Sequence, residues 1–407
     1  MKSKILSVII CFCSVQFTMA HTIDLPVELK NSTVSVIVSD VETGEIILEH
    51  QSEQSATPAS ITKLITTATA LELLGPDFRF TTLIAHDGTL VNGILKGNLY
   101  IIGSGDPTLG STYFNEEKCL SNWAKNLQNM GITEIQGDII ADASLFDKEP
   151  LPVRWTWEDI GNYYAAGVYG LSVFDNTTHI TLRSKNIGSK PEIIEVKPAY
   201  VDLKLENCVE VTSIKFDSTY LYGIPYDQHR VLRGAMPAHR EKFVVKGDIP
   251  NPPLYLVQQL KRELTQRHIT VKGSATDQIT SIESRTTLFT HHSPKLSEIC
   301  RVINFFSNNN YAEHLFKQLS LQRNPLATNK EAQEVILNFW RSKGIDTQPL
   351  LLNDGSGLSP MNTFSAKFLN AILSYMIRSS NSQTFIETIP RAGVEGTVKN
   401  FLKNPAI

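Results

Sequence analysis

The sequence changes character twice along its length, and this change constrains the fold more than any other feature. Near the start, residues 33–49 alternate apolar and polar side chains around a glycine turn, which predicts a β-hairpin, and residues 59–74 predict a helix. From about Phe78 to Ile282, short β-like runs are broken by glycine and proline. Helical patterns return after Ser297. This order predicts the α/β (α+β) class, with one domain interrupted by a large, mostly β insertion.

The expected domain boundaries follow these changes. Residues 21–77 and 284–407 are expected to form one domain, and residues 78–283 the insertion. Within the insertion, the polar and helix-poor stretch 183–248 predicts a smaller nested unit. A chain of 407 residues, of which 42% are hydrophobic, can bury more than one core.

Residues 1–20 have the three parts of a secretory signal peptide. Two lysines precede an apolar run, and small residues precede a cleavage site after Ala20. A transmembrane anchor is the alternative, but the apolar run is shorter than the roughly 20 residues that a bilayer requires. A lipoprotein site at Cys11 or Cys13 is a further alternative, although Ile10 is bulky where such a site prefers a small residue. We expect an exported protein in the periplasm or another extracytoplasmic compartment.

Charge and cysteine content exclude several classes of function. The formal charge of −3 and the absence of basic runs argue against nucleic-acid binding. After cleavage the chain keeps Cys119, Cys208 and Cys300, which allow one disulfide at most and do not have the spacing of a zinc site. The sequence does not indicate an oligomeric state.

Ser60 and Lys63 are the first candidate catalytic residues. Their spacing places both side chains on one face at the start of the predicted helix. An uncharged lysine amine can remove the proton of a serine hydroxyl, so Ser60 would be the nucleophile and Lys63 the general base. The start of a helix also supplies N–H groups for a developing oxyanion. The alternative is an ordinary exposed helix turn, because Ser-x-x-Lys alone is common.

Ser307-Asn308-Asn309 lies in a polar break between two helical patterns. Ser307 could relay a proton between Lys63 and the leaving group, and the Asn309 amide could hold a substrate peptide group. The alternative is a helix cap, since serine and asparagine are favoured there. Gly355 and Gly357 are interpreted as turn residues.

Further phrases accompany these two motifs along the chain. Together with Ser60-Ile61-Thr62-Lys63 and Ser307-Asn308-Asn309, they resemble the low-molecular-mass class C penicillin-binding proteins, the D-alanyl-D-alanine carboxypeptidase/endopeptidase family. The phrases are PASITKLITTATALELLGPDFRFTT, LYIIGSGDPTLGS, NNNYAEHLF, NDGSGLSPMN and IPRAGVEGT.

The resemblance implies a β-lactamase/transpeptidase-like catalytic domain split by an insertion. It implies cleavage of peptidoglycan stem peptides at the terminal D-alanine or at a cross-link, through a serine acyl-enzyme and without a metal or organic cofactor. It also implies inhibition by β-lactams, which would acylate Ser60. By the same analogy Asp142 could meet the amino group of a diaminopimelate side chain, although a strand-end aspartate is an equal interpretation.

One signature of the family is absent from the sequence. A Lys-Thr/Ser-Gly triplet is expected beyond a segment like FLKNPAI, and no such triplet occurs in the 407 residues. That strand supplies a cation for the substrate carboxylate and a donor to the oxyanion hole. We therefore expect an incomplete chain of an enzyme family. The alternatives are a catalytically silent peptidoglycan-binding relative and an unrelated β-rich adhesin.

Overall fold

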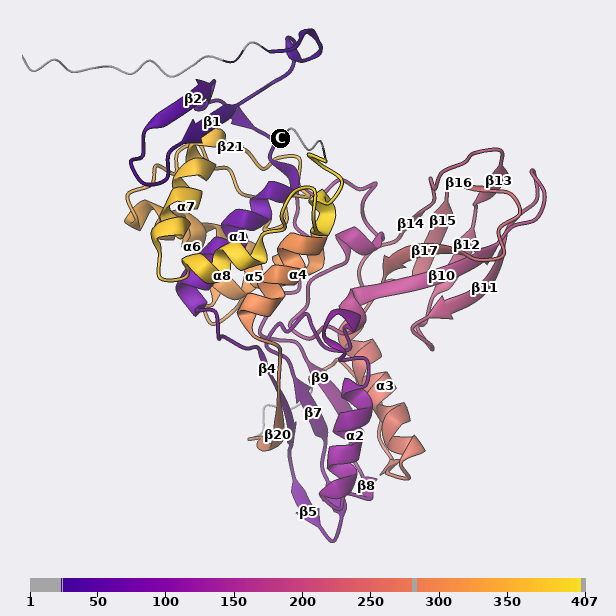
Figure 1. The fold of residues 1–407 in the computed structure, drawn as a ribbon. Helices are drawn as coiled ribbons and strands as arrows, with labels where there is room; N and C mark the ends of the chain where they lie inside the picture. Colours follow the sequence, from indigo (N-terminus) through magenta and orange to yellow (C-terminus); the bar gives the residue numbers. More distant parts are fainter. Residues whose placement is uncertain (1–22, 24, 280–283, 404–407) are drawn as a thin grey trace, which may run out of the picture.

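The computed structural model describes residues 23, 25–279 and 284–403, so the expected signal peptide lies outside the described residues. Figure 1 shows a helical part, a sheet part below it and a small β unit that projects to one side. The mixture of helices and sheets confirms the predicted α/β class. None of the helices in the described ranges is long and apolar enough to cross a membrane.

The helical part combines both ends of the chain. Its helices share a buried apolar core that runs from Ile65 to Phe385. Beside it, the predicted hairpin forms from β1 (Val36–Ser39) and β2 (Ile46–His50). The helices are α1 (Thr62–Leu74), α4 (Leu296–Phe306), α5 (Asn309–Ser320), α6 (Asn329–Ser342), α7 (Ala366–Arg378) and α8 (Ser382–Thr388), and β3 (Ser55–Ala56) pairs with β21 (Phe364–Ser365).

Helix α1 lies within this core, buried along most of its length, and its threonines make that burial possible. The Thr67 and Thr69 hydroxyls donate to carbonyls of their own helix, and the Thr66 hydroxyl donates to the Gly355 carbonyl at 2.7 Å. Because these hydroxyls are satisfied, a helix with polar residues on several faces can be buried. The helix ends at Gly75, whose positive φ of 83° suits a residue without a Cβ.

The sheet part consists of two sheets covered by helices α2 (Cys119–Asn129) and α3 (Pro252–Gln266) (Figure 1). The larger sheet has the order β19-β9-β7-β4-β20, and the smaller has the order β18-β8-β6-β5. Strand β20 pairs antiparallel with β4 and reaches His292, so this sheet includes residues beyond 283. The strands are β4 (Thr81–His86), β5 (Thr89–Val91), β6 (Ile94–Lys96), β7 (Leu99–Ile102), β8 (Glu134–Ile135), β9 (Ile139–Asp142), β18 (Thr270–Val271), β19 (Ala275–Thr276) and β20 (Thr286–His292).

The small β unit comprises strands β10–β17, residues 177–248. It has an apolar core of its own, centred on Ile180, Leu221 and Val245. Its sheets have the orders β11-β10-β17, β12-β15-β14 and β13-β16. The strands are β10 (Thr177–Arg183), β11 (Glu192–Lys197), β12 (Lys204–Asn207), β13 (Glu210–Thr212), β14 (Tyr220–Tyr222), β15 (His229–Arg233), β16 (Ala235–Pro237) and β17 (Phe243–Asp248).

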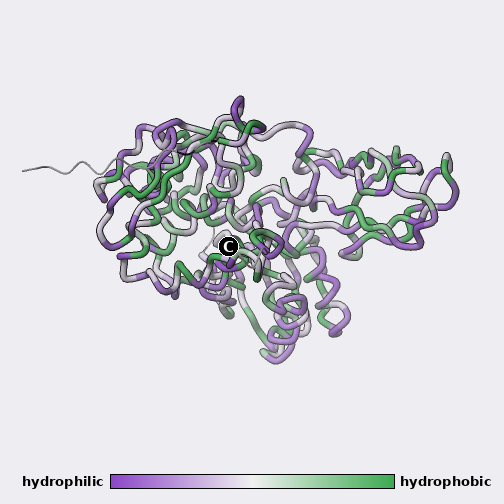
Figure 2. The backbone as a smooth tube through the Cα atoms, turned by 45° about the horizontal axis from the view of Figure 1, so that its top comes forward, coloured by the Kyte–Doolittle hydropathy of each residue, from purple (hydrophilic) through white to green (hydrophobic). Residues whose placement is uncertain are grey.

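Hydrophobic residues are distributed over all the parts. In Figure 2 they run through the helical part and through the strands of the small β unit. Each part therefore buries an apolar cluster of its own. Cys119, Cys208 and Cys300 are free thiols, and the first and last of them are buried.

Candidate active site

Ser60 lies in a short 3₁₀ turn, Ala59–Ile61, that leads directly into α1. Ala59 takes a positive φ of 49°, which turns the chain just before the serine. The Ser60 side chain is exposed, whereas the following Thr62 and Lys63 are buried. A serine hydroxyl at the start of a buried helix is therefore accessible to solvent.

The Lys63 amine contacts three oxygen atoms and is almost fully buried, with 2% of the residue exposed. It donates to Ser60 Oγ at 3.1 Å, to Asn309 Oδ1 at 2.6 Å and to the Ser356 carbonyl at 2.7 Å. All three partners are uncharged. The structure thus brings together Ser60, Lys63 and Asn309, although 246 residues separate Lys63 from Asn309.

Burial lowers the pKa of Lys63 to about 8, and the charges of Glu313 and Asp354 limit the shift. The amine can then lose a proton near neutral pH. Asn309 Oδ1 and the Ser356 carbonyl can only accept, so they retain two of the three N–H groups. The lone pair of the neutral amine consequently faces Ser60 Oγ, which can donate its own proton.

A buried glutamate on α5 supports the loop of Gly355 and Ser356, whose Ser356 carbonyl binds Lys63. Glu313 accepts hydrogen bonds from the backbone N–H groups of Gly355 at 3.2 Å and of Ser356 at 2.7 Å. Its burial, together with the nearby Asp354, raises the pKa of the Glu313 carboxyl to about 8. Glu313 and Lys63 therefore titrate in the same pH range.

Asp354 organises the rest of this loop. Its carboxylate is fully buried and accepts hydrogen bonds from the loop and from the insertion. Gly357 follows with a positive φ of 80°, and a Cβ there would lie 1.9 Å from the Ala59 carbonyl oxygen. The loop thus packs against the turn that carries Ser60. The donors to Asp354 are Trp155 Nε1 at 2.7 Å, Gly357 N at 2.8 Å, Ser359 N at 2.6 Å and Asn362 Nδ2 at 2.6 Å.

Ser307-Asn308-Asn309 joins α4 to α5 through a left-handed residue, Ser307, with φ 53°. Asn308 is the helix cap, because its side chain accepts from Tyr311 N at 3.1 Å. Asn309 uses both ends of its amide: Oδ1 accepts from Lys63, and Nδ2 donates to the Tyr164 carbonyl at 2.8 Å. The cap interpretation therefore applies to Asn308, while Asn309 contacts the lysine.

The structure places Ser307 beside this cluster but not in its hydrogen-bond network. Ser307 and Asn309 line a pocket of about 220 Å³ together with Tyr163 and Tyr164. Among the residues that the structure describes, the Ser307 hydroxyl makes no hydrogen bond to Ser60 or Lys63.

Asp142 is placed elsewhere, at the end of β9. It accepts hydrogen bonds from Ser144 and forms an ion pair with Arg285 at 2.5 Å. Burial opposes ionisation, but these partners outweigh it and hold the pKa of Asp142 below its usual value. The carboxylate has no hydrogen bond to the Ser60 cluster within the described residues, and its charge is already compensated by Arg285.

Sequence reasoning did not find Glu313, Asp354 or Ser356 as functional residues. Their roles depend on contacts with chain segments about 40 to 300 residues away, which no local spacing encodes. The glycine-rich phrase NDGSGLSPMN could have pointed to Asp354 and Ser356, because a tight turn around an aspartate brings its backbone groups close to neighbouring side chains.

The chain is similar to proteins named as D-alanyl-D-alanine carboxypeptidases. A D-alanyl-D-alanine carboxypeptidase from an Actinomadura species is 28% identical over 392 residues, covering 93% of this chain and 72% of that protein. The D-alanyl-D-alanine carboxypeptidase DacB of Haemophilus influenzae is 25% identical over 377 residues, covering 91% of this chain and 76% of that protein.

Solved structures agree with this similarity. The crystal structure of penicillin-binding protein 4 (dacB) from Haemophilus influenzae matches with a TM-score of 0.79 and 25% identity, over 90% of this chain and 80% of that one. The profile of the D-Ala-D-Ala carboxypeptidase 3 (S13) family matches residues 18–406. This match spans nearly the whole sequence, and the chain therefore belongs to the D-Ala-D-Ala carboxypeptidase 3 (S13) family.

Proposed function

We propose that this protein cleaves D-alanyl-D-alanine bonds of peptidoglycan stem peptides through an acyl-enzyme on Ser60. The observation that supports this most is the Lys63 amine, buried and bonded to uncharged acceptors, with Ser60 Oγ among them. The named relatives are D-alanyl-D-alanine carboxypeptidases, which agrees with such chemistry. Both a carboxypeptidase and an endopeptidase would use the same steps.

In the first step neutral Lys63 takes the proton of Ser60, and Oγ attacks the carbonyl carbon of the penultimate D-alanine. The C–N bond then breaks. The leaving amine receives the proton held by Lys63, with Ser307 as the proposed relay, and the peptide remains as an ester on Ser60. Water attacks this ester in the second step, and its proton returns to Ser60 through the same lysine.

Asn309 serves first to position Lys63 in this proposal. Its Oδ1 is occupied by the amine, and one Nδ2 hydrogen is occupied by the Tyr164 carbonyl. The expected contact with a substrate peptide group would use the second Nδ2 hydrogen. For Asp142, the expected contact with a diaminopimelate amino group would have to share the carboxylate with Arg285.

We also propose that the protein works outside the cytoplasm, where its polymeric substrate lies, and that β-lactams acylate Ser60. One matching structure of the Haemophilus influenzae protein, 24% identical to this chain, is described as a complex with a β-lactam. Residues 21–77 and 284–407 would form the catalytic domain, and the insertion of residues 78–283 would lie beside it. No observation favours a catalytically silent peptidoglycan-binding protein.

The proposal is tested by labelling with a fluorescent penicillin and by release of D-alanine from a stem pentapeptide. The parent in this test is the chain joined to a Lys-Thr/Ser-Gly strand of the family. It should show both, and Ser60→Ala should show neither, because no other group replaces the nucleophile. Ser32→Ala, a change at an exposed serine outside the site, is the control and should behave as the parent. Equal labelling of the parent and Ser60→Ala would show that Ser60 is not the nucleophile.

A further inference from the structure

A stacked pair of aromatic rings, one exposed and one half-buried, lies where the insertion loop meets the small β unit. Trp157 stacks on Tyr222, with ring centroids 4.8 Å apart and planes inclined by 17°. Tyr220 meets Tyr222 edge-on at 5.0 Å. Trp157 is 72% exposed. We call Trp157, Tyr220 and Tyr222 the aromatic platform.

A pocket of about 270 Å³ opens beside this platform. Its lining includes the apolar side chains of Trp157, Tyr222 and Ile224 together with polar side chains. Arg233 lies over the Tyr222 ring at 5.6 Å and, within the described residues, has no carboxylate partner. Apolar rings with a few hydrogen-bonding groups at the edge form the usual composition of a ligand site. The other polar side chains that line it are those of Asp227 and His229.

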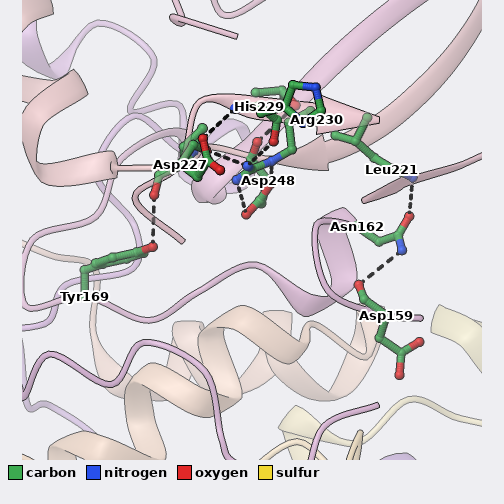
Figure 3. Close-up of polar contacts among 10 residues, drawn as sticks. Asp159, Asn162, Tyr169, Leu221, Asp227, His229, Arg230 and Asp248 are labelled. Atoms are coloured by element: carbon green, nitrogen blue, oxygen red, sulfur yellow. Dashed lines mark hydrogen bonds and ion pairs between the residues drawn. The ribbon is translucent and has the colours of Figure 1, made fainter. Parts of the chain in front are cut away.

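Backbone and side-chain contacts at Gly161 and Asn162 fix the position of the platform. Asn162 Oδ1 accepts from Leu221 N at 3.0 Å, next to Tyr222, and the Asn162 amide donates to the Asp159 carbonyl at 3.1 Å (Figure 3). A Cβ on Gly161 would lie 2.5 Å from Gly223 N, so the two backbones approach closely there. A surface fixed in this way loses little conformational entropy when a ligand binds.

Deeper in the same junction, Arg230 and Asp248 form a buried ion pair (Figure 3). Two guanidinium nitrogens donate to the two carboxylate oxygens, at 2.8 and 3.0 Å. Arg230 also donates to the carbonyls of Asp227 and His229, which line the pocket. This part of the lining therefore keeps its geometry without a ligand.

The loop that carries Trp157 also reaches the candidate active site at both of its ends. Trp155 donates to Asp354, and the Tyr164 carbonyl accepts from Asn309. Trp157 thus lies on a short segment that contacts Asp354 at one end and Asn309 at the other. The platform is therefore connected to the candidate active site through one continuous segment, residues 155–164.

We propose that the aromatic platform and its pocket bind the glycan strand of peptidoglycan. The proposal rests on the proposed function, because the stem peptide that would be cut is attached to this polymer of N-acetylated hexosamines. The C–H faces of sugar rings pack well on flat aromatic side chains, and hydroxyl and acetamido groups can bond Asp227, His229 and Arg233. Holding the strand raises the effective concentration of its stem peptides at Ser60.

The experiment measures binding of peptide-free glycan strands, prepared from sacculi with an amidase, to the full protein. Trp157→Ala and Tyr222→Ala should each weaken binding by about tenfold or more, since tenfold corresponds to about 1.4 kcal/mol, the scale of one aromatic contact. Trp157→Phe should retain most of the affinity. Phe216→Ala, at an exposed aromatic residue of the same small β unit outside this pocket, should bind as the parent does.

Two outcomes separate this inference from the proposed function. Ser60→Ala should bind glycan like the parent, and a parent that binds glycan through Trp157 but shows no penicillin labelling would contradict the proposed function alone. The proposal would be overturned if Trp157→Ala and Tyr222→Ala both kept the parent's glycan affinity. It would also be overturned if Phe216→Ala reduced the affinity equally. If Tyr222→Ala unfolds, the glycan affinity of Trp157→Ala alone tests the proposal, because Trp157 is exposed.

Discussion

Two buried cations, Lys63 in the candidate active site and Arg230 at the base of the small β unit, have opposite surroundings. Lys63 has uncharged partners: a hydroxyl, a side-chain amide oxygen and a backbone carbonyl. Arg230 faces the carboxylate of Asp248 with two parallel hydrogen bonds (Figure 3). Both side chains are nearly inaccessible to solvent.

This difference determines what each cation can do. Uncharged partners leave the cost of burying the ammonium largely uncompensated, so the pKa of Lys63 falls to about 8 and the residue can act as a base. A guanidinium does not deprotonate in proteins, and its carboxylate partner compensates its charge. The cost of burying a cation thus makes Lys63 a reactive base. At Arg230 the same cost is offset by Asp248, and the pair has a structural role.

Lys63→Met should have the largest effect on this comparison. Loss of the general base should reduce the rate of penicillin acylation by about 10³-fold, within the 10²–10⁴ range of such catalysis. Because Met removes a poorly compensated buried charge, the melting temperature should stay within a few degrees of the parent's. Stopped-flow or gel-based labelling and a thermal melt measure the two quantities.

Lys317→Met is the matched change for that experiment. Lys317 is also a buried lysine, on α5, but it is paired with Asp147 at 2.5 Å. Its replacement should lower the melting temperature while the folded protein still reacts with penicillin at nearly the parent rate. If instead Lys63→Met reacts with penicillin at the parent rate, Lys63 is not the general base. Its uncharged surroundings would then have no catalytic role.

Breaking the second cation's pair should cost stability. Asp248→Asn leaves the Arg230 charge buried without its counter-ion, which should reduce the free energy of unfolding by about 3–5 kcal/mol. The melting temperature should fall by at least about 5 °C. Arg230→Met combined with Asp248→Leu should recover much of the loss, and a double variant as unstable as Asp248→Asn would show that the ion pair itself stabilises the fold.

The pH dependence of acylation should report Lys63 directly. Below pH 8 the neutral amine falls tenfold per unit, to about one tenth of the molecules at pH 7, so the rate should rise with pH and level off above about 8. Ionised Glu313 raises the pKa of Lys63, but its own pKa is also about 8, so it carries a charge mainly in the upper part of this pH range. Glu313→Gln should therefore move only the upper part of the rising limb to lower pH. Glu334→Gln, at an exposed position on α6, should leave the limb in place.

Asn309→Ala should have the smallest of these effects. It removes one acceptor from the Lys63 amine and the bond to the Tyr164 carbonyl, but it leaves Ser60 and the base present. Acylation should slow by about tenfold rather than stop, since positioning is weakened and the nucleophile remains. Complete loss of labelling in a well-folded Asn309→Ala protein would mean that Asn309 takes part in the chemistry.

Local pattern was enough to predict several parts of the fold. The hairpin, the helix that begins near Ser60 and the polar break at Ser307 depend on residues close in sequence, so alternation, capping and turn residues predict them. The contact between Ser60 and Lys63 also follows from helical spacing.

The remainder depends on contacts between distant segments. Arg285 meets Asp142 across 143 residues, and Trp155 meets Asp354 across 199, and neither pair has a signal in the local sequence. The uncharged surroundings of Lys63 are likewise a property of the folded loop at Ser356. Sequence can suggest a lysine base, but only the packing determines its pKa.

Helix α5 is buried along almost its whole length and contacts both the helical part and the insertion, so it can reach its final environment only when both are present. Its residues bond the insertion through Tyr311 to Asp175 and through Lys317 to Asp147. During synthesis the apolar residues of α1 emerge more than 200 residues before α5, and their core also needs the helices near the end of the chain. The sheet part and the small β unit can complete their cores first and present a formed surface, on which α5 docks and then closes the helical part over α1.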